Sequence, residues 1–405
     1  MEDFAPLLAS LIAVLVGAKL LGVLANRAGM PSVLGELTAG VLLGGSLLGL
    51  LDPHEPVMHA LSELGVLILL FEIGLHTDLR SLAKVGGTAS TVGIVGVVLP
   101  FALGFLVSRW LGVEPLSAIV CGAALTATSI GISARVLSDL GQLETPEGQV
   151  VLGAAVLDDV VGLIILSVVS GLAAGGELHP LEIGRITLVA VGFIVAALVI
   201  GSLVAPPAFQ GVDKWRRTAG VLGPLALAFA LLLAYLAHLS GSAMIIGAFA
   251  AGLVLHGTPQ RAAIEKSVIT LGHYIVPIFF ATVGASVDVR SLAGAAILKV
   301  GGALVVVGIL TKIAAGYAPW WFKGRKLLVG VAMVPRGEVG LIFAQVGLTA
   351  GVLNVPLFSA LTLMVMVTTF VAPPMLSRLS RGDRRGSTRE SSGAADLVSG
   401  MAKGE

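Results

Sequence analysis

The sequence predicts an all-α polytopic membrane protein with about thirteen transmembrane helices, arranged as two repeats of opposite orientation. Of its 405 residues, 56% are hydrophobic and only 12% are charged, whereas soluble domains carry about 25% charged residues. A sequence pattern also recurs after about 210 residues. Because the formal net charge is only +1, no overall field would attract nucleic acid, and we expect no nucleic-acid partner.

Apolar runs separated by charged residues, proline or glycine mark the expected spans. We expect one membrane domain over residues 1–379, in contact with membrane lipid. Residues 380–405 are mostly polar and charged, which favours a disordered cytoplasmic tail. The expected spans begin near residues 4, 32, 57, 86, 115, 147, 183, 217, 240, 266, 292, 326 and 355.

Basic residues are concentrated in alternate loops between these spans. Arg80 and Lys84 follow the third span, for example, and Lys323, Arg325 and Lys326 follow the eleventh. Cytoplasmic loops carry an excess of lysine and arginine, so this bias places the C-terminus in the cytoplasm and the N-terminus outside. The odd number of expected spans agrees with termini on opposite sides.

Two segments of the first half recur in the second half at an offset of about 210 residues. Residues 35–43 (GELTAGVLL) resemble 247–255 (GAFAAGLVL), and residues 74–83 (GLHTDLRSLA) resemble 284–293 (GASVDVRSLA). The offset shifts the pattern by seven spans, an odd number, so corresponding helices must cross the membrane in opposite directions. Such an inverted-topology repeat is typical of secondary transporters. Spans one to six then match spans eight to thirteen, and the seventh connects them.

The fifth and twelfth spans contain helix-breaking residues at equivalent repeat positions. Hydroxyl side chains surround a glycine in 126–133, and a proline, glycines and two charges occupy 334–340. Both segments can unwind near the middle of the membrane where protein or water satisfies the freed backbone groups. A Ser/Thr-bonded bend and an ordinary proline kink are the simpler alternative. We expect two discontinuous, crossing helices, broken around Thr126, Thr128, Ser129, Pro335, Arg336, Gly337 and Glu338.

Asp158 and Asp159 lie side by side within the sixth span, near mid-membrane. A carboxylate there costs roughly 3 kcal/mol, and such a cost usually marks an ion or proton pathway. A carboxyl group in apolar surroundings holds its proton more tightly than in water, and hard cations prefer oxygen ligands. One acid can therefore hold either a proton or a cation, which is sufficient for antiport. A purely structural acid pair is the alternative.

Lys312, in the eleventh span, is the candidate counter-charge for the acid pair. Its position near a helix end would equally allow its ammonium group to snorkel to the membrane surface. Arg336 and Glu338 lie deeper, where they can pair with each other, interact with the ends of the crossing helices, or serve a structural role. Spacing alone leaves these alternatives open.

Four segments taken together resemble the bacterial monovalent cation:proton antiporters, and most closely the NapA-like sodium/proton branch, which is related to the Kef-type transporters. They are 126–137 (TATSIGISARVL), 157–163 (LDDVVGL), 309–312 (ILTK) and 335–342 (PRGEVGLI). The resemblance implies a transporter of sodium or lithium and protons, without enzymatic activity or cofactor. It implies that Asp159 binds sodium and carries the proton, and that Asp158 forms a salt bridge with Lys312 that breaks when sodium binds.

The resemblance also implies an NhaA/NapA-like fold, a homodimer and elevator-like alternating access in a prokaryotic cytoplasmic (inner) membrane. Two parts of the chain, about 4–78 and 217–287, would form the scaffold, joined through a connector helix at about 183–205. The moving core would comprise about 86–172 and 292–376.

Two acids at 158 and 159 favour electrogenic sodium/proton exchange, because electroneutral relatives typically carry asparagine at the first position and Kef-type potassium systems glutamine. A Kef-like potassium/proton antiporter is the main alternative. A passive cation channel is more remote, since inverted repeats with broken helices suit alternating access better than a continuous pore. An intramembrane aspartyl protease needs carboxylates that face each other from separate helices, which neighbours on one helix cannot supply.

Overall fold

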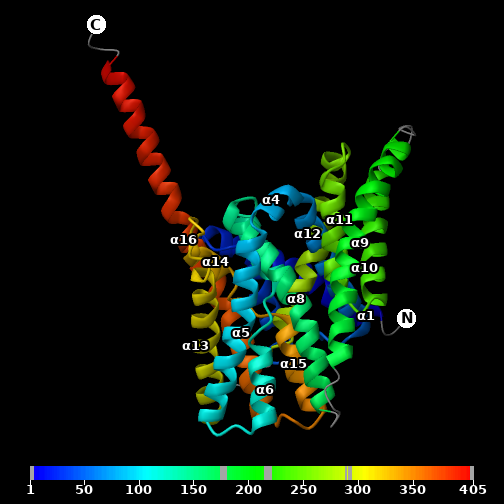
Figure 1. Ribbon diagram of the computed structural model, residues 1–405, viewed down its shortest axis with the longest axis vertical. Helices are drawn as coiled ribbons and strands as arrows, with labels where there is room; N and C mark the ends of the chain where they lie inside the picture. The colour runs from blue at the N-terminus through cyan, green and yellow to red at the C-terminus, as the bar shows by residue number, and fades with distance from the viewer. Residues whose placement is uncertain (1–3, 174–179, 214–220, 288–289, 291–293, 402–405) are drawn as a thin grey trace.

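The computed structural model describes all residues except 1–3, 174–179, 214–220, 288–289, 291–293 and 402–405, and this part of the chain is almost entirely α-helical (Figure 1). Its helices are α1 (Phe4–Arg27), α2 (Ser32–Leu43), α3 (Pro56–His76), α4 (Leu79–Lys84), α5 (Gly86–Trp110), α6 (Pro115–Ala124), α7 (Ile130–Asp139), α8 (Pro146–Ala173), α9 (Pro180–Asp213), α10 (Leu222–Leu239), α11 (Met244–His256), α12 (Arg261–Ala285), α13 (Ala295–Tyr317), α14 (Lys326–Ala332), α15 (Glu338–Thr349) and α16 (Val355–Met401).

The helices follow the expected spans closely. Each predicted start lies within five residues of a helix start, the largest differences being 217 against Leu222 and 266 against Arg261. Within the described residues, eight helices are long and apolar enough to cross a membrane. The helix α8, which carries the acid pair, has 28 residues. The expected second and ninth spans, α2 and α11, are shorter, with 12 and 13 residues, because both are largely buried among other helices rather than exposed along a whole membrane thickness.

The two halves of the chain run in opposite directions. The half-helix α6 lies at the lower end of the molecule in Figure 1, directly after α5, whereas α14, directly after α13, lies toward the upper end. Since α5 and α13 begin at equivalent repeat positions and pack against each other, they are antiparallel. The inverted repeat expected from the sequence is therefore present.

The repeated glycines lie where helices cross at backbone contact. A Cβ atom on Gly40 of α2 would lie 2.0 Å from the carbonyl oxygen of Ala281 in α12, and one on Gly252 of α11 would lie 2.3 Å from that of Phe71 in α3. Two further glycines of the repeated segments, Gly74 and Gly284, face the same two crossings from the opposite helices. Each repeat therefore contributes one helix to each crossing. The glycines recur in the sequence because a side chain at these positions would overlap the backbone of the crossing helix.

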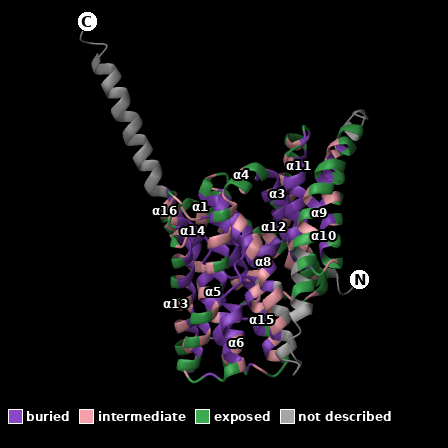
Figure 2. Cartoon of the chain, in the orientation of Figure 1, coloured by how far each residue is buried: buried purple, intermediate pink, exposed green. Residues whose placement is uncertain are grey.

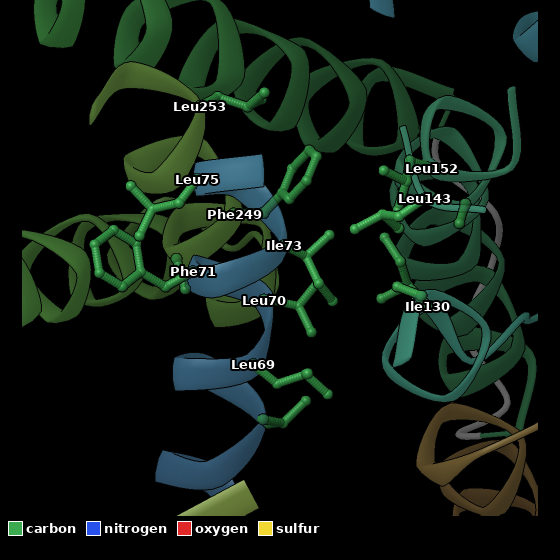
Figure 3. Packing of buried hydrophobic residues seen from close by; sticks show 14 of the residues in the cluster. Leu69, Leu70, Phe71, Ile73, Leu75, Ile130, Leu143, Leu152, Phe249 and Leu253 are labelled. Atoms are coloured by element: carbon green, nitrogen blue, oxygen red, sulfur yellow. The ribbon is translucent and has the colours of Figure 1, made fainter. Parts of the chain in front are cut away.

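We refer to α1–α3 with α10–α12 as the scaffold, and to α5–α8 with α13–α16 as the core, because each group is held together by its own helix contacts. Apolar side chains join the two groups: in Figure 3, Leu70 and Ile73 of α3 face Ile130 of α7 and Leu152 of α8. The molecule's interior is buried, while the outward sides of α9 and α13 are exposed (Figure 2). Apolar residues such as Leu203 on those sides are exposed, as a lipid-facing surface requires.

The helix α16 is the last element of the chain and extends beyond the other helices (Figure 1). The side chains of 381–401 and all of residues 402–405 lie outside the described part. The disordered cytoplasmic tail expected over 380–405 therefore stays a prediction.

The glycine crossings predict a sharp difference between two substitutions. We expect Gly40→Ala to lower stability by at least about 1–3 kcal/mol, because the added methyl group overlaps a backbone carbonyl that cannot move away. Gly302→Ala in α13 is the control, since a Cβ there meets nothing within 4 Å. It should leave the thermal midpoint of the purified protein unchanged or raise it slightly. Equal midpoints for the two variants would contradict this account.

Candidate ion-binding site

Both predicted helix breaks are observed. The fifth span is interrupted between Ala124, where α6 ends, and Ile130, where α7 begins. The twelfth is interrupted between Ala332 and Glu338, the end of α14 and the start of α15. The proline within the second break has no N–H to donate to a helical bond, and Gly337, the residue before α15, adopts φ −130° and ψ −144°, so the helical bond pattern cannot continue through the segment.

The two breaks bind each other directly. The Ser129 N–H donates to the carbonyl oxygen of Pro335 at 2.9 Å, and the Ser133 hydroxyl donates to that of Ala332 at 2.6 Å. A longer bond of 3.4 Å runs from the Thr128 hydroxyl to the carbonyl oxygen of Met333. Backbone groups that leave the helical pattern are thus satisfied by the opposite repeat, as the interior of a membrane protein demands.

Gly337 allows the two broken segments to approach this closely. A Cβ at this position would lie 2.6 Å from the Ser129 hydroxyl oxygen and 2.9 Å from the Ser129 Cβ. Those distances are too short for non-bonded atoms, so any side chain would push the crossing apart. The glycine predicted in the break therefore has a steric role at the contact between repeats.

Arg336 lies at the centre of the crossing and is fully buried. Its Nη1 donates to the carbonyl oxygens of Ala127 at 2.7 Å and Thr126 at 3.3 Å, which follow the C-terminal end of α6. A cation there offsets the partial negative charge of a helix C-terminus. The Thr369 hydroxyl in α16 donates to the Arg336 carbonyl. Glu338 is the first residue of α15, and its side chain lies outside the described part, so the alternatives for Arg336 and Glu338, of which mutual pairing is one, stay open.

Asp158 and Lys312 face each other in the core. Lys312 Nζ lies 3.2 Å from Asp158 Oδ2, and both side chains have no exposed surface. The ammonium therefore does not snorkel to the membrane surface. The lysine passes close to α5 at Gly96, where a Cβ would lie 3.4 Å from Nζ. Sequence reasoning missed Gly96, because nothing in the sequence places α5 against this lysine.

Asp159 is the more accessible of the two acids, with 9% of its surface exposed against 1% for Asp158. Their helix, α8, packs against all four half-helices, α6, α7, α14 and α15. The acid pair consequently lies beside the crossing, together with hydroxyl groups and carbonyl oxygens that have left the helical pattern. Among the described residues no group of three or more His, Cys, Asp and Glu side chains could hold a metal ion. A monovalent cation would instead combine carboxylate oxygen with hydroxyl, carbonyl or water oxygen.

The described side chains of the buried site include two acids and two bases. Asp158 and Asp159 can carry two negative charges, and Lys312 and Arg336 two positive charges. With all four ionised, these side chains carry no net charge together, and this balance limits the cost of burying each charge. Adding one cation leaves an excess of one positive charge, which the release of a proton would remove.

Comparisons with known proteins place the chain among membrane exchangers. Residues 10–382 match the sequence model of the family described as "Sodium/hydrogen exchanger, transmembrane". The chain is 39% identical to the high-affinity Na+/H+ antiporter NhaS3 of Synechocystis sp., over 94% of this chain and 91% of that protein. It is 33% identical to the Na+/H+-K+ antiporter GerN of Bacillus cereus, over 90% of this chain and 93% of that protein.

Among solved structures, the sodium proton antiporter MjNhaP1 of Methanocaldococcus jannaschii superposes with a TM-score of 0.69 at 17% sequence identity. The superposition covers 93% of this chain and 97% of the other. At this identity the likeness concerns the fold, and it confirms the fold class expected from the sequence.

The buried ion pair predicts a rescue experiment. We expect Lys312→Met to lower stability by about 3–5 kcal/mol, because it leaves the Asp158 carboxylate buried without its partner. The double variant Lys312→Met with Asp158→Asn removes that uncompensated charge and should recover part of the loss. Thermal unfolding of the purified variants measures both, with Lys299→Met as the control, since Lys299 lies in the same helix and is exposed. A double variant no more stable than the single one would contradict the pairing.

Proposed function

The chain belongs to the sodium/hydrogen exchanger family, and we propose that it is a secondary active antiporter that exchanges sodium or lithium for protons across a prokaryotic cytoplasmic membrane. One observation above all supports this proposal: an acid pair, half of it ion-paired with a fully buried lysine, lies beside two broken helices that cross within the membrane domain. The N-terminus lies outside and the C-terminus in the cytoplasm, as the distribution of basic residues favours.

Asp159 carries the transported ion in this proposal. Asp159 keeps more exposed surface than Asp158, 9% against 1%, which favours Asp159 as the acid that water, protons and cations reach, while Asp158 is ion-paired with Lys312. A proton and a cation compete for the same oxygens, and either one neutralises the carboxylate for passage through the membrane. The empty site carries a charge, and moving it through the membrane costs much more free energy. The site therefore moves only with a cation or a proton bound, and the two ions are exchanged.

The charge balance of the site favours electrogenic exchange. When a cation binds Asp159, the excess positive charge weakens the hold of the site on the Lys312 proton. Loss of that proton breaks the salt bridge and frees Asp158, whose Oδ1 already has no hydrogen-bond partner among the described residues. The cation then displaces one proton from Asp159 and a second from Lys312, and net charge moves across the membrane in each cycle.

Movement of the core against the scaffold provides alternating access. Apolar contacts dominate the surface between them in the described residues, and such contacts are non-directional, so one surface can shift along the other. Backbone crossings at glycines hold the scaffold together. We also propose that the scaffold forms a homodimer, because α1 presents exposed apolar residues, including Ile12 and Leu20, that a second copy can cover.

Potassium/proton exchange is the second candidate function. It is favoured by one of the relatives, GerN, whose name includes potassium beside sodium. Both cations are hard and prefer oxygen ligands, and selection between them depends on how closely the oxygens approach the ion.

Removing the proposed ion-binding carboxylate tests the assignment. We expect Asp159→Asn to abolish sodium-driven proton movement in reconstituted vesicles while the protein stays folded, because the amide is isosteric but can neither release a proton nor offer a negative charge to sodium. The control is Glu63→Gln, an acid of α3 whose side chain is 51% exposed, which should transport normally. Substantial transport by Asp159→Asn would exclude Asp159 as the carrier.

Ion choice and charge movement are separated in one assay. Vesicles with an imposed pH gradient receive sodium, lithium or potassium, with and without a membrane voltage, and a pH-sensitive dye reports collapse of the gradient. We expect sodium and lithium to collapse it, at a rate that changes with voltage because net charge moves. A response to potassium alone supports the second candidate, and a rate independent of voltage contradicts electrogenic exchange.

A further inference from the structure

Four side-chain hydrogen bonds join the core to the scaffold at one end of the molecule, the end from which α16 emerges (Figure 1). Three of them involve Ser32, the first residue of α2. Its backbone N–H and its hydroxyl donate to Asp139 Oδ2 at 3.2 and 2.9 Å, and Arg135 Nη2 donates to its hydroxyl oxygen at 3.5 Å. The fourth runs from the Ser377 hydroxyl in α16 to the Gly29 carbonyl at 2.9 Å.

Asp139 belongs to the core, and its carboxylate caps the N-terminus of α2, a helix of the scaffold. The residue before α2 is Pro31, which makes no side-chain capping bond, so the first N–H groups of α2 lack the usual local acceptor. The Asp139 carboxylate, at the end of α7 in the core, takes that place. A negative charge is favourable at a helix N-terminus, and Arg135 Nε, 3.2 Å from Asp139 Oδ1, holds the carboxylate in position.

Glu36 lies one turn further along α2 and is buried, with 6% of its surface exposed. Its Oε2 has no hydrogen-bond partner among the described residues. The charged form of a buried acid is stabilised by a nearby cation, and Arg135 is the cation that the core brings to this part of α2, beside Asp139. The charged groups at this contact therefore favour close approach of α7 to the scaffold.

The other repeat has no equivalent set of charges. At the repeat offsets, Arg135 and Asp139 correspond to Gln345 and Thr349 of α15, and Ser32 corresponds to Met244 of α11. The Thr349 hydroxyl bonds within its own helix, to the Gln345 carbonyl at 3.0 Å. Whereas α7 packs against α2 and α3 of the scaffold, the half-helices α6 and α15 pack against core helices.

From this asymmetry we infer that Ser32, Arg135 and Asp139 form a lock between core and scaffold, which closes the side from which α16 emerges and holds the antiporter in the conformation described. The inference rests on the proposed alternating access, because a lock has a function only if the core moves. Opening requires α7 to leave α2, which costs the α2 N-terminus its cap. Among the described residues the opposite side has no such bonds to break, so the lock stabilises one conformation relative to the other.

The chain contains a matched control for this lock. Glu147 Oε1 accepts the backbone N–H of Arg325 at 2.9 Å and lies 3.5 Å from Arg325 Nε. This carboxylate thus satisfies the start of α14 and pairs with an arginine, as Asp139 does at α2, but both partners belong to the core. Loss of either acid removes a similar set of bonds, and only loss of Asp139 releases the core from the scaffold.

Hydrogen exchange of the purified protein, followed by mass spectrometry, tests the lock without any transport. We expect Asp139→Ala to raise exchange in both α2 and α7, and Asp139→Asn, which keeps a capping oxygen, to raise it less. The control variant Glu147→Ala should raise exchange at the start of α14 and leave α2 unchanged. Unchanged exchange of α2 in Asp139→Ala overturns the inference, as does an equal rise in α2 from Glu147→Ala.

Reversible cross-linking tests whether opening is needed for transport. Ser32→Cys and Asp139→Cys are combined with Cys121→Ser, which removes the chain's own cysteine, and a short thiol reagent bridges the pair in vesicles. We expect sodium-driven proton movement to be lost on bridging and to return on reduction. Unimpaired transport by the bridged protein overturns the lock. Absence of cation-driven proton movement in the unaltered protein instead counts against the proposed function, and the exchange measurement then decides the lock separately.

Discussion

The structure depends on burying four ionisable side chains, Asp158, Asp159, Lys312 and Arg336, in a membrane domain that is otherwise largely apolar. Each of these charges would be expensive alone, and they are tolerable only because their signs balance and their polar atoms find partners. Broken helices supply some of those partners: carbonyl oxygens beyond the end of α6 accept bonds from Arg336. Crossing of the repeats, glycine at the contact and room for the lysine beside α5 all follow from this requirement.

Much of the fold was predictable because it follows from local sequence patterns. Apolar runs marked the helices, proline and glycine marked the breaks, and the repeated segments marked the inverted repeat. The site was predictable to the level of residue type, since acids within a span are conspicuous. Its contacts were not: Gly96 beside Lys312, Asp139 at the start of α2, and Thr369 against Arg336 are pairings between distant segments, and no local pattern records them.

The two repeats share a backbone design and differ in the side chains that carry the chemistry. At the same offset that relates the glycines, Asp158 and Asp159 correspond to Thr368 and Thr369, and Lys312 corresponds to Ala102. One repeat contributes acids, and the other contributes the lysine and the arginine. In the proposed mechanism, symmetry of the backbone provides two related conformations, while asymmetry of the side chains gives one ion-binding site and one charged contact between core and scaffold.

The bond between Ser129 and Pro335, with glycine opposite the serine, joins the two broken helices into one compact unit. Such a unit carries its oxygen atoms unchanged as the core moves. The free energy of binding a cation is then the same whichever side the site faces, apart from any difference in the stability of the two conformations. Under the proposed mechanism, the protein has no preferred direction of its own at the site. The concentrations and the voltage across the membrane decide which ion enters the cell and which one leaves.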